Sequence, residues 1–352
     1  MRNIIFKHKR YVIFVLCILF VLAAHSSRGR IADNISTEKP WDRWSGSDIK
    51  NGYVAAYIPE KEGLDEETII GYTGTYKSSL QEESFEESDN KRLYLDAYSC
   101  ESQLEVSKEL GSTPVKVNVT AVGGDFFFFH PMQLLSGSYI DKSNLMHDGV
   151  VLDENTAWSL YGSSNIQGKT FVINNKYYYI AGVVKGSDSK YAKRTYGSRS
   201  RMFMHFDEYK KMDDTAVITS YEMIYPELIT GRAEKVMKSL FNIQDAEEQV
   251  EGSIENESLV EIVDMTRRYN FTRLLGVAKD YGYRSSGSKG ILYPFWENEC
   301  RMAEDYAAIW ALLELIFGII AGLLLVPDIV RVYKVSVGFC EKQIAQIKER
   351  FS

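Results

Sequence analysis

A glycine-rich stretch near the middle of the chain carries the residues with the clearest chemical meaning. Residues 162–170 read GSSNIQGKT, which is similar to the loop that wraps nucleotide phosphates in many ATPases. That motif needs four residues between its two glycines, whereas five separate Gly162 from Gly168. A helical pattern precedes the stretch and a strand-like pattern follows Lys169, so no helix N-terminus would face a phosphate. We therefore expect a turn leading into a hairpin, and no nucleotide cofactor.

Histidines could act as bases or metal ligands, but here they are scattered. The chain has five of them: His8, His25, His130, His147 and His205. His130 stands close to Asp125 in a tight turn, and with no nucleophile nearby we expect it to pack in the core or in the turn. The sequence contains no H-E-x-x-H, C-x-x-C or G-x-S-x-G motif. We therefore predict no catalytic, cofactor or metal site, and no hydrolase or other enzyme.

The four cysteines allow one bond between exported thiols. Cys17 falls in the first apolar segment and Cys340 in the C-terminal tail, which leaves Cys100 and Cys300. One pair so far apart, in a domain with an ample core, is not a disulfide framework, and sequence alone does not fix the connectivity. A disulfide and two reduced thiols are both open at this point.

Residues 119–184 contain the glycine-rich stretch, His130 and His147, and they have the pattern of short strands separated by tight turns. Apolar runs between Gly, Asp and Asn clusters predict strands at residues 126–129, 150–152 and 177–184. Between them we expect one short helix, capped by Asp153 and ended by a left-handed Gly162. Its buried side consists of Ala157, Leu160 and Tyr161.

The segments on both sides of this region follow an α+β pattern. Strands are expected at residues 52–58, 92–98, 115–122, 221–228 and 259–265. Helices are expected at residues 64–81, 232–241 and 271–281, the first capped by Asp65 and the second by Thr230. The basic run 185–201 and the acidic run 245–257 are expected to be loops. We infer an α+β fold in which a discontinuous subdomain, residues 45–115 and 216–300, carries a β-rich insert, residues 116–215.

Composition supports a folded chain and argues against one class of partner. Apolar residues make up 45% and charged residues 25% of the 352 residues. The net charge of −7 lacks the excess of Lys and Arg that a nucleic-acid surface needs. We expect no nucleic-acid partner.

The N-terminal residues predict a membrane segment. Residues 1–10 are basic and are expected to stay in the cytoplasm, and residues 11–27 are apolar enough for a first transmembrane helix. The alternative is a cleaved signal peptide, because the run is short and Ala24 and Ser26 are small. We favour the uncleaved anchor.

A second apolar segment follows the exported region. Residues 301–326 are expected to form a stalk and a second transmembrane helix, with the span itself at 307–326 and Trp296 and Trp310 near the membrane interface. Pro327 closes the span, and the cations of residues 327–352 predict a cytoplasmic tail. Both termini are then cytoplasmic, and residues 28–300 form an extracytoplasmic domain at the plasma membrane.

Three residues of the second span are candidates for helix association. Glu314 lies within the apolar run, where a charge is costly unless it is protonated or paired, so it either bonds to a neighbouring helix or has a role in partner choice. Gly318 and Gly322 form a G-x-x-x-G pattern that permits close approach of another helix.

Five motifs in order carry a family resemblance. They are VGGDFF at residues 122–127, LLSG at 134–137, VVLDENTAWSLYG at 150–162, IQGK at 166–169 and YYYIAGVV at 177–184. Together they resemble the MacB-like extracytoplasmic (periplasmic) core domain of MacB/FtsX-type ABC transporter permeases. The resemblance covers roughly residues 45–300 and implies two subdomains with an interrupted layout.

The resemblance also implies a function. Permeases of this family have further membrane helices, whereas this chain has one after the outer domain and no ATPase motif. We expect a permease-like or accessory subunit that pairs with an ABC permease and an ATPase, or with a second copy, and whose outer domain transmits movement or helps assembly. The alternative is a stand-alone extracytoplasmic module that binds or senses peptide, lipid or cell-wall material.

Overall fold

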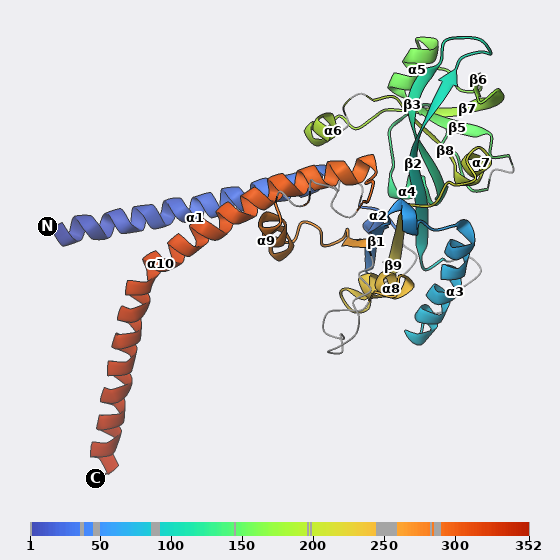
Figure 1. Cartoon of the computed structure of the whole chain (residues 1–352). Helices are drawn as coiled ribbons and strands as arrows, with labels where there is room; N and C mark the ends of the chain where they lie inside the picture. Colours follow the sequence, from blue (N-terminus) through green and yellow to red (C-terminus); the bar gives the residue numbers. More distant parts are fainter. Residues whose placement is uncertain are drawn as a thin grey trace. The chain divides into compact units, whose positions relative to one another are not determined.

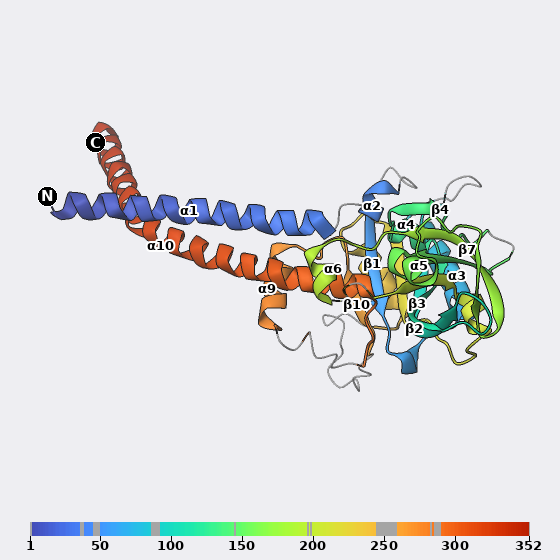
Figure 2. The same ribbon diagram turned by 90° about the horizontal axis from the view of Figure 1, so that it is seen from above.

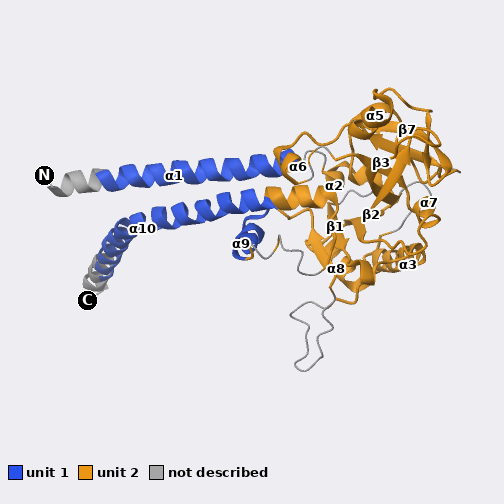
Figure 3. Cartoon of the chain, turned by 45° about the horizontal axis from the view of Figure 1, so that its top comes forward, with its two compact units in different colours: residues 1–35, 269–279, 304–352 blue, residues 36–268, 280–303 orange. Residues whose placement is uncertain are grey.

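The computed structural model divides the chain into two compact units (Figures 1 and 3). Unit 1 comprises residues 1–35, 269–279 and 304–352, and unit 2 comprises residues 36–268 and 280–303. The structure describes residues 2–35, 39–44, 50–85, 92–143, 146–195, 197, 199–243, 259–281, 284 and 290–351. The acidic run 245–257, predicted to be a loop, lies outside the described residues.

Unit 2 is built on a ten-stranded mixed sheet. Its strand order is β10-β1-β9-β2-β3-β8-β5-β7-β4, and β6 pairs with both β2 and β7. The strands are β1 (Asn51–Tyr57), β2 (Leu95–Ser107), β3 (Val115–Gly124), β4 (Leu134–Gly137), β5 (Gly149–Asp153), β6 (Thr170–Ile173), β7 (Lys176–Val184), β8 (Arg201–His205), β9 (Ser220–Pro226) and β10 (Glu261–Asp264). The pairs β3–β8 and β5–β7 are parallel, and the other pairs are antiparallel.

The central strands are covered on both faces, which is why they read as continuous apolar runs. Every residue of β1 is buried, and its side chains alternate between the two faces of the sheet because successive residues of a strand point to opposite sides. Val54 packs in one cluster and Tyr53 in the other. This architecture confirms the α+β fold class, whereas the division into two subdomains stays a prediction.

Helices cover the face of the sheet that carries Val54, as their sequences predict. These helices include α3 (Glu66–Glu82), α5 (Glu154–Tyr161) and α8 (Arg232–Leu240). The side chain of Asp65 accepts a hydrogen bond from the amide of Thr68 at 2.8 Å, and Asp153 caps α5 in the same way. Gly162 ends α5 with φ of 64°, the left-handed conformation expected of it. Helix α8 begins behind Gly231, one residue after the predicted cap.

Residues 126–129 are a helical turn, α4 (Phe126–Phe129), so the strand predicted there is wrong. Strand β3 ends at Gly124, whose φ of 66° turns the chain away from the sheet. The amide of His130 then donates to the carbonyl of Phe126 at 2.9 Å, which closes the turn. Phe126 and Phe129 lie one turn apart and are buried together. This run of four aromatic residues therefore packs on the face of the sheet that carries Tyr53.

Short helices complete unit 2. They are α2 (Pro40–Arg43), the 3-10 turn η1 (Glu60–Glu62), α6 (Lys190–Thr195) and α7 (Phe206–Lys210). Helix α6 lies in the basic run 185–201, where a loop was expected, and its Tyr191 and Ala192 are buried. Unit 2 also contains the first residues of α10 (Phe295–Phe351).

Unit 1 consists mainly of two long apolar helices. They are α1 (Arg2–Ile35) and the part of α10 after Ala303, with the short α9 (Phe271–Lys279). Within the described residues, stretches inside Lys9–Ile35 and Phe295–Glu341 are long and apolar enough to cross a membrane. Figures 1 and 2 show α1 and α10 running side by side over part of their length.

Helix α10 continues through Pro327 instead of ending there. Proline has no amide hydrogen and its ring crowds the preceding turn, so inside a helix it produces a bend. Figure 1 shows that α10 is bent along its course. Pro327 therefore separates two parts of one helix and does not separate a span from an irregular tail.

Candidate functional site

The first turn of α10 is embedded in unit 2 and forms the best-defined polar and aromatic site of the outer domain. Trp296 is 7% exposed, so its ring packs inside the outer domain. Its ring lies 5.3 Å from the ring of Phe126 and 4.3 Å from that of His130, measured between centroids. The start of the second apolar helix, α10, therefore packs against the aromatic residues of α4.

Glu297, the next residue, is fully buried and forms ion pairs with two arginines. Arg268 donates to its two carboxylate oxygens at 2.6 and 2.7 Å, and Nε of Arg301 donates at 2.7 Å. Burial works against the charged carboxylate, but the two guanidinium groups outweigh it and hold the pKa of Glu297 at about 2. The residue lies ten positions before the span predicted at residues 307–326, in unit 2.

The sheet contributes to the same ionic cluster. Tyr57 of β1 donates its hydroxyl hydrogen to Glu297 at 2.9 Å, and burial next to this carboxylate raises the pKa of Tyr57 well above its ordinary value. Arg301 also pairs with Glu261 of β10 and lies over the ring of Tyr293, 3.7 Å from its centroid. The start of α10 is thus tied to two strands through charge-assisted bonds, which are stronger than neutral ones.

A second buried acid contacts His130, whose ring packs against Trp296. Glu222 of β9 is 1% exposed, and Nε2 of His130 lies 2.6 Å from one of its oxygens. Tyr53 donates to the other oxygen, and burial beside Glu222 raises the pKa of Tyr53 well above its ordinary value. His130 is half-buried at the end of the α4 turn, and its partner is Glu222. Asp125, the carboxylate near it in sequence, pairs with Arg92 and Lys142 instead.

In unit 1 the predicted helix-association residues separate into two groups. Glu314 pairs with α1 of the same chain: its carboxylate lies 3.3 Å from Nε of Arg28 and 3.2 Å from Nδ1 of His25. Further along the pair, the rings of Phe20 and Phe317 are 4.1 Å apart, and Arg10 pairs with Asp328. The helix that Glu314 contacts in this structure is therefore α1.

Gly318 and Gly322 do not contact α1. Both are exposed, and a Cβ added at either position would meet no atom within 4 Å. The G-x-x-x-G face thus lies open on the surface of unit 1.

No disulfide joins Cys100 and Cys300. Cys100 is a free thiol buried in β2, whereas Cys300 lies in α10. Burial raises the pKa of Cys100 to about 12, so this thiol stays protonated and unreactive at neutral pH. Sequence spacing could not decide this question, because it does not report which face of β2 the thiol occupies.

The stretch similar to a phosphate loop is the predicted turn into the β6–β7 hairpin. Gly168 adopts φ of 77° just before β6, and the ammonium group of Lys169 lies 5.0 Å from the centroid of the Tyr161 ring. No helix N-terminus follows the lysine, in agreement with the context read from the sequence.

The fold also assembles a cluster that sequence reasoning missed. His147, His205 and Asp207 come from the segment before β5, the end of β8 and the first turn of α7. His147 is too far from the other two in sequence for any spacing rule, and only the antiparallel pairing of β5 with β8 joins them. The sole local signal was the His-x-Asp spacing at a strand end.

Comparisons with known proteins identify the region around these sites. The family model of the MacB-like periplasmic core domain matches residues 54–263, which is more than half of the chain. The periplasmic region of MacB from Actinobacillus actinomycetemcomitans shares 14% identity, with coverage of 65% of this chain and 94% of that chain and a TM-score of 0.40. The extracellular domain of the noncanonic ABC-type transporter YknZ from Gram-positive bacteria shares 13% identity, with coverage of 55% and 97% and a TM-score of 0.38. No curated protein matches the sequence.

Proposed function

Because the chain belongs to the MacB-like periplasmic core domain family, we propose that it is a membrane-anchored, permease-like or accessory subunit of an ABC transporter. Its outer domain transmits movement between the membrane helices and the outside, and it performs no chemistry of its own. Both termini lie in the cytoplasm, because the cations gather at the N-terminus and after the second span.

The observation that carries this proposal is the attachment of α10. Glu297 and Trp296 are buried among strands and aromatic residues of unit 2, and the same helix continues into the apolar segment. No Gly or Pro interrupts the helix between Trp296 and Trp310. A helix without a break resists bending, so displacement of its membrane part is passed to the residues that grip its start.

Breaking the helix tests the proposal. The chain is reconstituted with its ATPase partner, and a fluorophore is placed on Ile70→Cys, an exposed position of α3. A Gly-Ser segment inserted after Ala303 should abolish the nucleotide-dependent change of the signal. An insert of seven alanine-rich residues, about two helical turns, is the control and should preserve it. An unchanged signal with the Gly-Ser insert would refute transmission through α10.

The exposed Gly318 and Gly322 support the choice of a membrane helix as the partner. Gly318 and Gly322 are exposed and have no neighbour, which supports packing against a helix of a fuller permease. A pull-down of the full chain from mild detergent should recover this permease together with an ATPase. Recovery of neither would favour the stand-alone binding or sensing module, and recovery of a second copy alone would indicate a homodimer.

A topology experiment tests the orientation independently. Tags at the two termini should be inaccessible from outside intact cells or spheroplasts, while added protease should cleave the outer domain. Accessible tags combined with a protected domain would contradict the proposed orientation.

A further inference from the structure

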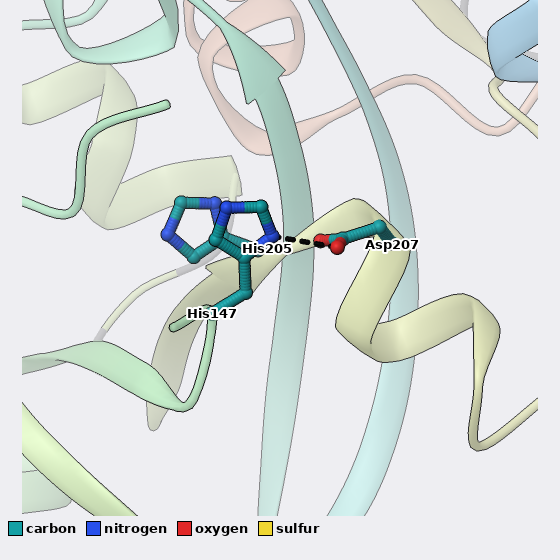
Figure 4. Close-up of side chains that lie close together, drawn as sticks. All are labelled: His147, His205 and Asp207. Carbon is teal, nitrogen blue, oxygen red and sulfur yellow. Dashed lines mark hydrogen bonds and ion pairs between the residues drawn. The ribbon is translucent and has the colours of Figure 1, made fainter. Parts of the chain in front are cut away.

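The cluster of His147, His205 and Asp207 has a donor geometry that the rest of the outer domain does not explain. One donor atom from each side chain lies within 4.8 Å of the others, and Nδ1 of His147 is 2.6 Å from Oδ2 of Asp207. The two imidazole rings stack at 4.1 Å between centroids with 17° between their planes. Figure 4 shows the rings face to face, with the carboxylate of Asp207 beside them.

His205 is the residue that needs an explanation. Its side chain belongs to a residue that is 6% exposed, and its Nε2 has no hydrogen-bond partner among the described residues. A buried polar atom without a partner costs roughly 1–3 kcal/mol. A bound ion would satisfy that atom, while a purely structural histidine at this position would be better replaced by an apolar ring.

The other two side chains leave a route for an ion. The side chains of His147 and Asp207 are 29% and 34% exposed, so the cluster opens to solvent on their side. Lys211 is the nearest competing cation, with its ammonium group 3.9 Å from Asp207, but it bonds to Glu208 at the shorter distance of 2.9 Å. The carboxylate of Asp207 is therefore not committed to a lysine.

We propose that His147, His205 and Asp207 bind a divalent transition-metal ion, with Zn²⁺ as the reference ion. Two imidazoles and one carboxylate are a borderline donor set that suits zinc, whereas Mg²⁺ and Ca²⁺ prefer sites made of oxygen alone. Three protein donors leave a fourth position for water or for an outside ligand.

Binding requires a small rearrangement. Donors of one tetrahedral zinc ion lie about 3.3 Å apart, given bond lengths near 2.0–2.1 Å, so the most separated pair must approach. The stacked rings must also tilt, because an imidazole binds through the nitrogen lone pair in its own plane. The exposed His147 and Asp207 side chains can supply this motion while the buried His205 stays in place.

The bound ion would fasten the segment before β5 to the β8–α7 junction. Because His147 precedes β5 while His205 and Asp207 flank the start of α7, the metal adds a link between neighbouring strands of the insert. This role is separate from the proposed transmission through α10, so each can fail without the other.

Zinc titration of the purified full chain tests the proposal. The chain carries a tag without histidine, is freed of metal with a chelator, and is titrated with Zn²⁺ by calorimetry in detergent. One ion per chain is expected. Because replacement of groups that merely support metal ligands costs about 10–100-fold in affinity, His147→Gln and Asp207→Asn should each weaken binding by at least that factor.

Controls separate loss of the site from loss of the fold. His25→Gln removes a histidine of α1 in unit 1 and should leave zinc affinity unchanged. Both ligand variants change partly exposed side chains, so circular dichroism should match that of the parent chain. Co²⁺ should give the visible absorption of a four-coordinate ion in the parent chain only. Absence of stoichiometric Zn²⁺ binding, or equal affinity in the parent and both ligand variants, would overturn the proposal.

Discussion

Arg268 grips Glu297 through both terminal nitrogens of its guanidinium group, at 2.6 and 2.7 Å, in a part of the outer domain that solvent does not reach. Such a pair stabilises little on balance, since both charges lost their hydration, but it is costly to break. Its geometric effect is definite. The fork of Arg268 fixes the position of the Glu297 carboxylate, and with it the first turn of α10, within unit 2.

Removal of one partner of this pair should destabilise the outer domain. Glu297→Ala leaves Arg268 and Arg301 buried without their shared carboxylate, and breaking a buried pair in this way costs about 3–5 kcal/mol. Thermal or urea unfolding of the full chain in detergent measures the loss. The exposed acid Glu67 of α3 provides the control, as Glu67→Ala should change stability by less than about 0.5 kcal/mol.

A double variant distinguishes charge imbalance from lost packing. Glu297→Leu combined with Arg268→Met replaces the pair by apolar side chains of similar size, and such replacements are often neutral or stabilising. We expect the double variant to recover most of the stability lost by Glu297→Ala. A double variant less stable than Glu297→Ala would show that the ion pair itself contributes to stability.

The half-buried carboxyl of Glu101 predicts a pH dependence of stability. Burial in β2 raises its pKa to about 7, although the Thr120 hydroxyl donates to it at 2.8 Å. The unfolded chain releases this proton near the ordinary pKa, so the folded state loses stability as the pH rises from about 4.5 to about 7. Glu101→Gln should be as stable as the parent at pH 4 and more stable at pH 8, by about 1–3 kcal/mol at 1.4 kcal/mol per pKa unit.

Chemical denaturation of both forms at pH 4, 6 and 8 measures this difference. Glutamine keeps an oxygen that can accept from Thr120, so the hydrogen bond is preserved while the charge is removed. A difference in stability that does not grow between pH 4 and pH 8 would contradict the raised pKa.

The pairing of Glu314 with Arg28 should hold α1 and α10 together. Glu314→Leu leaves Arg28 facing an apolar surface, so we expect the helices to separate more often. Cysteines placed at Phe20 and Phe317, in a chain whose own cysteines are replaced by serine, should crosslink readily under oxidation. The crosslinking rate should fall several-fold with Glu314→Leu and should recover when Arg28→Leu is added to it. An unchanged rate in Glu314→Leu alone would exclude a role for the pair.

The glycine face predicts an effect on assembly alone. A Cβ at Gly318 meets no described atom within 4 Å, so Gly318→Ile should leave the fold and the α1–α10 crosslink unaffected. Co-purification of a partner helix should drop at least several-fold. Gly338→Ile, also without neighbours but beyond the predicted span, is the matched control. Equal partner recovery with both variants would remove Gly318 from the interface.

Local signals in the sequence were sufficient for the regular parts of the fold. Asp65 and Asp153 cap their helices as predicted, because a cap depends only on residues within one turn. The strand predicted at residues 126–129 is wrong because the composition of this run fits a strand and a buried turn equally well. The left-handed conformation of Gly124 decides between them. Tertiary context overrides propensity at such positions.

The candidate sites could not be predicted in the same way. Glu297 and Arg268 are 29 residues apart, and Tyr57 is 240 residues from Glu297, so no spacing rule joins them. The sequence predicts only a stalk around residue 301, and the contacts of Glu297 and Arg301 with strands β1 and β10 appear only in the fold. The same holds for His147 and His205, whose strands become neighbours through long-range pairing.

The length of α10 has a mechanical consequence. Its 57 residues extend roughly 85 Å along the axis, at about 1.5 Å per residue, against a hydrocarbon core of about 30 Å. Most of the helix therefore projects from lipid, and a fulcrum inside the bilayer would leave arms on either side. A small tilt about that point would move the ends of the helix much further than its middle. Pro327 would allow one of the two end parts to change its angle to the rest of the helix.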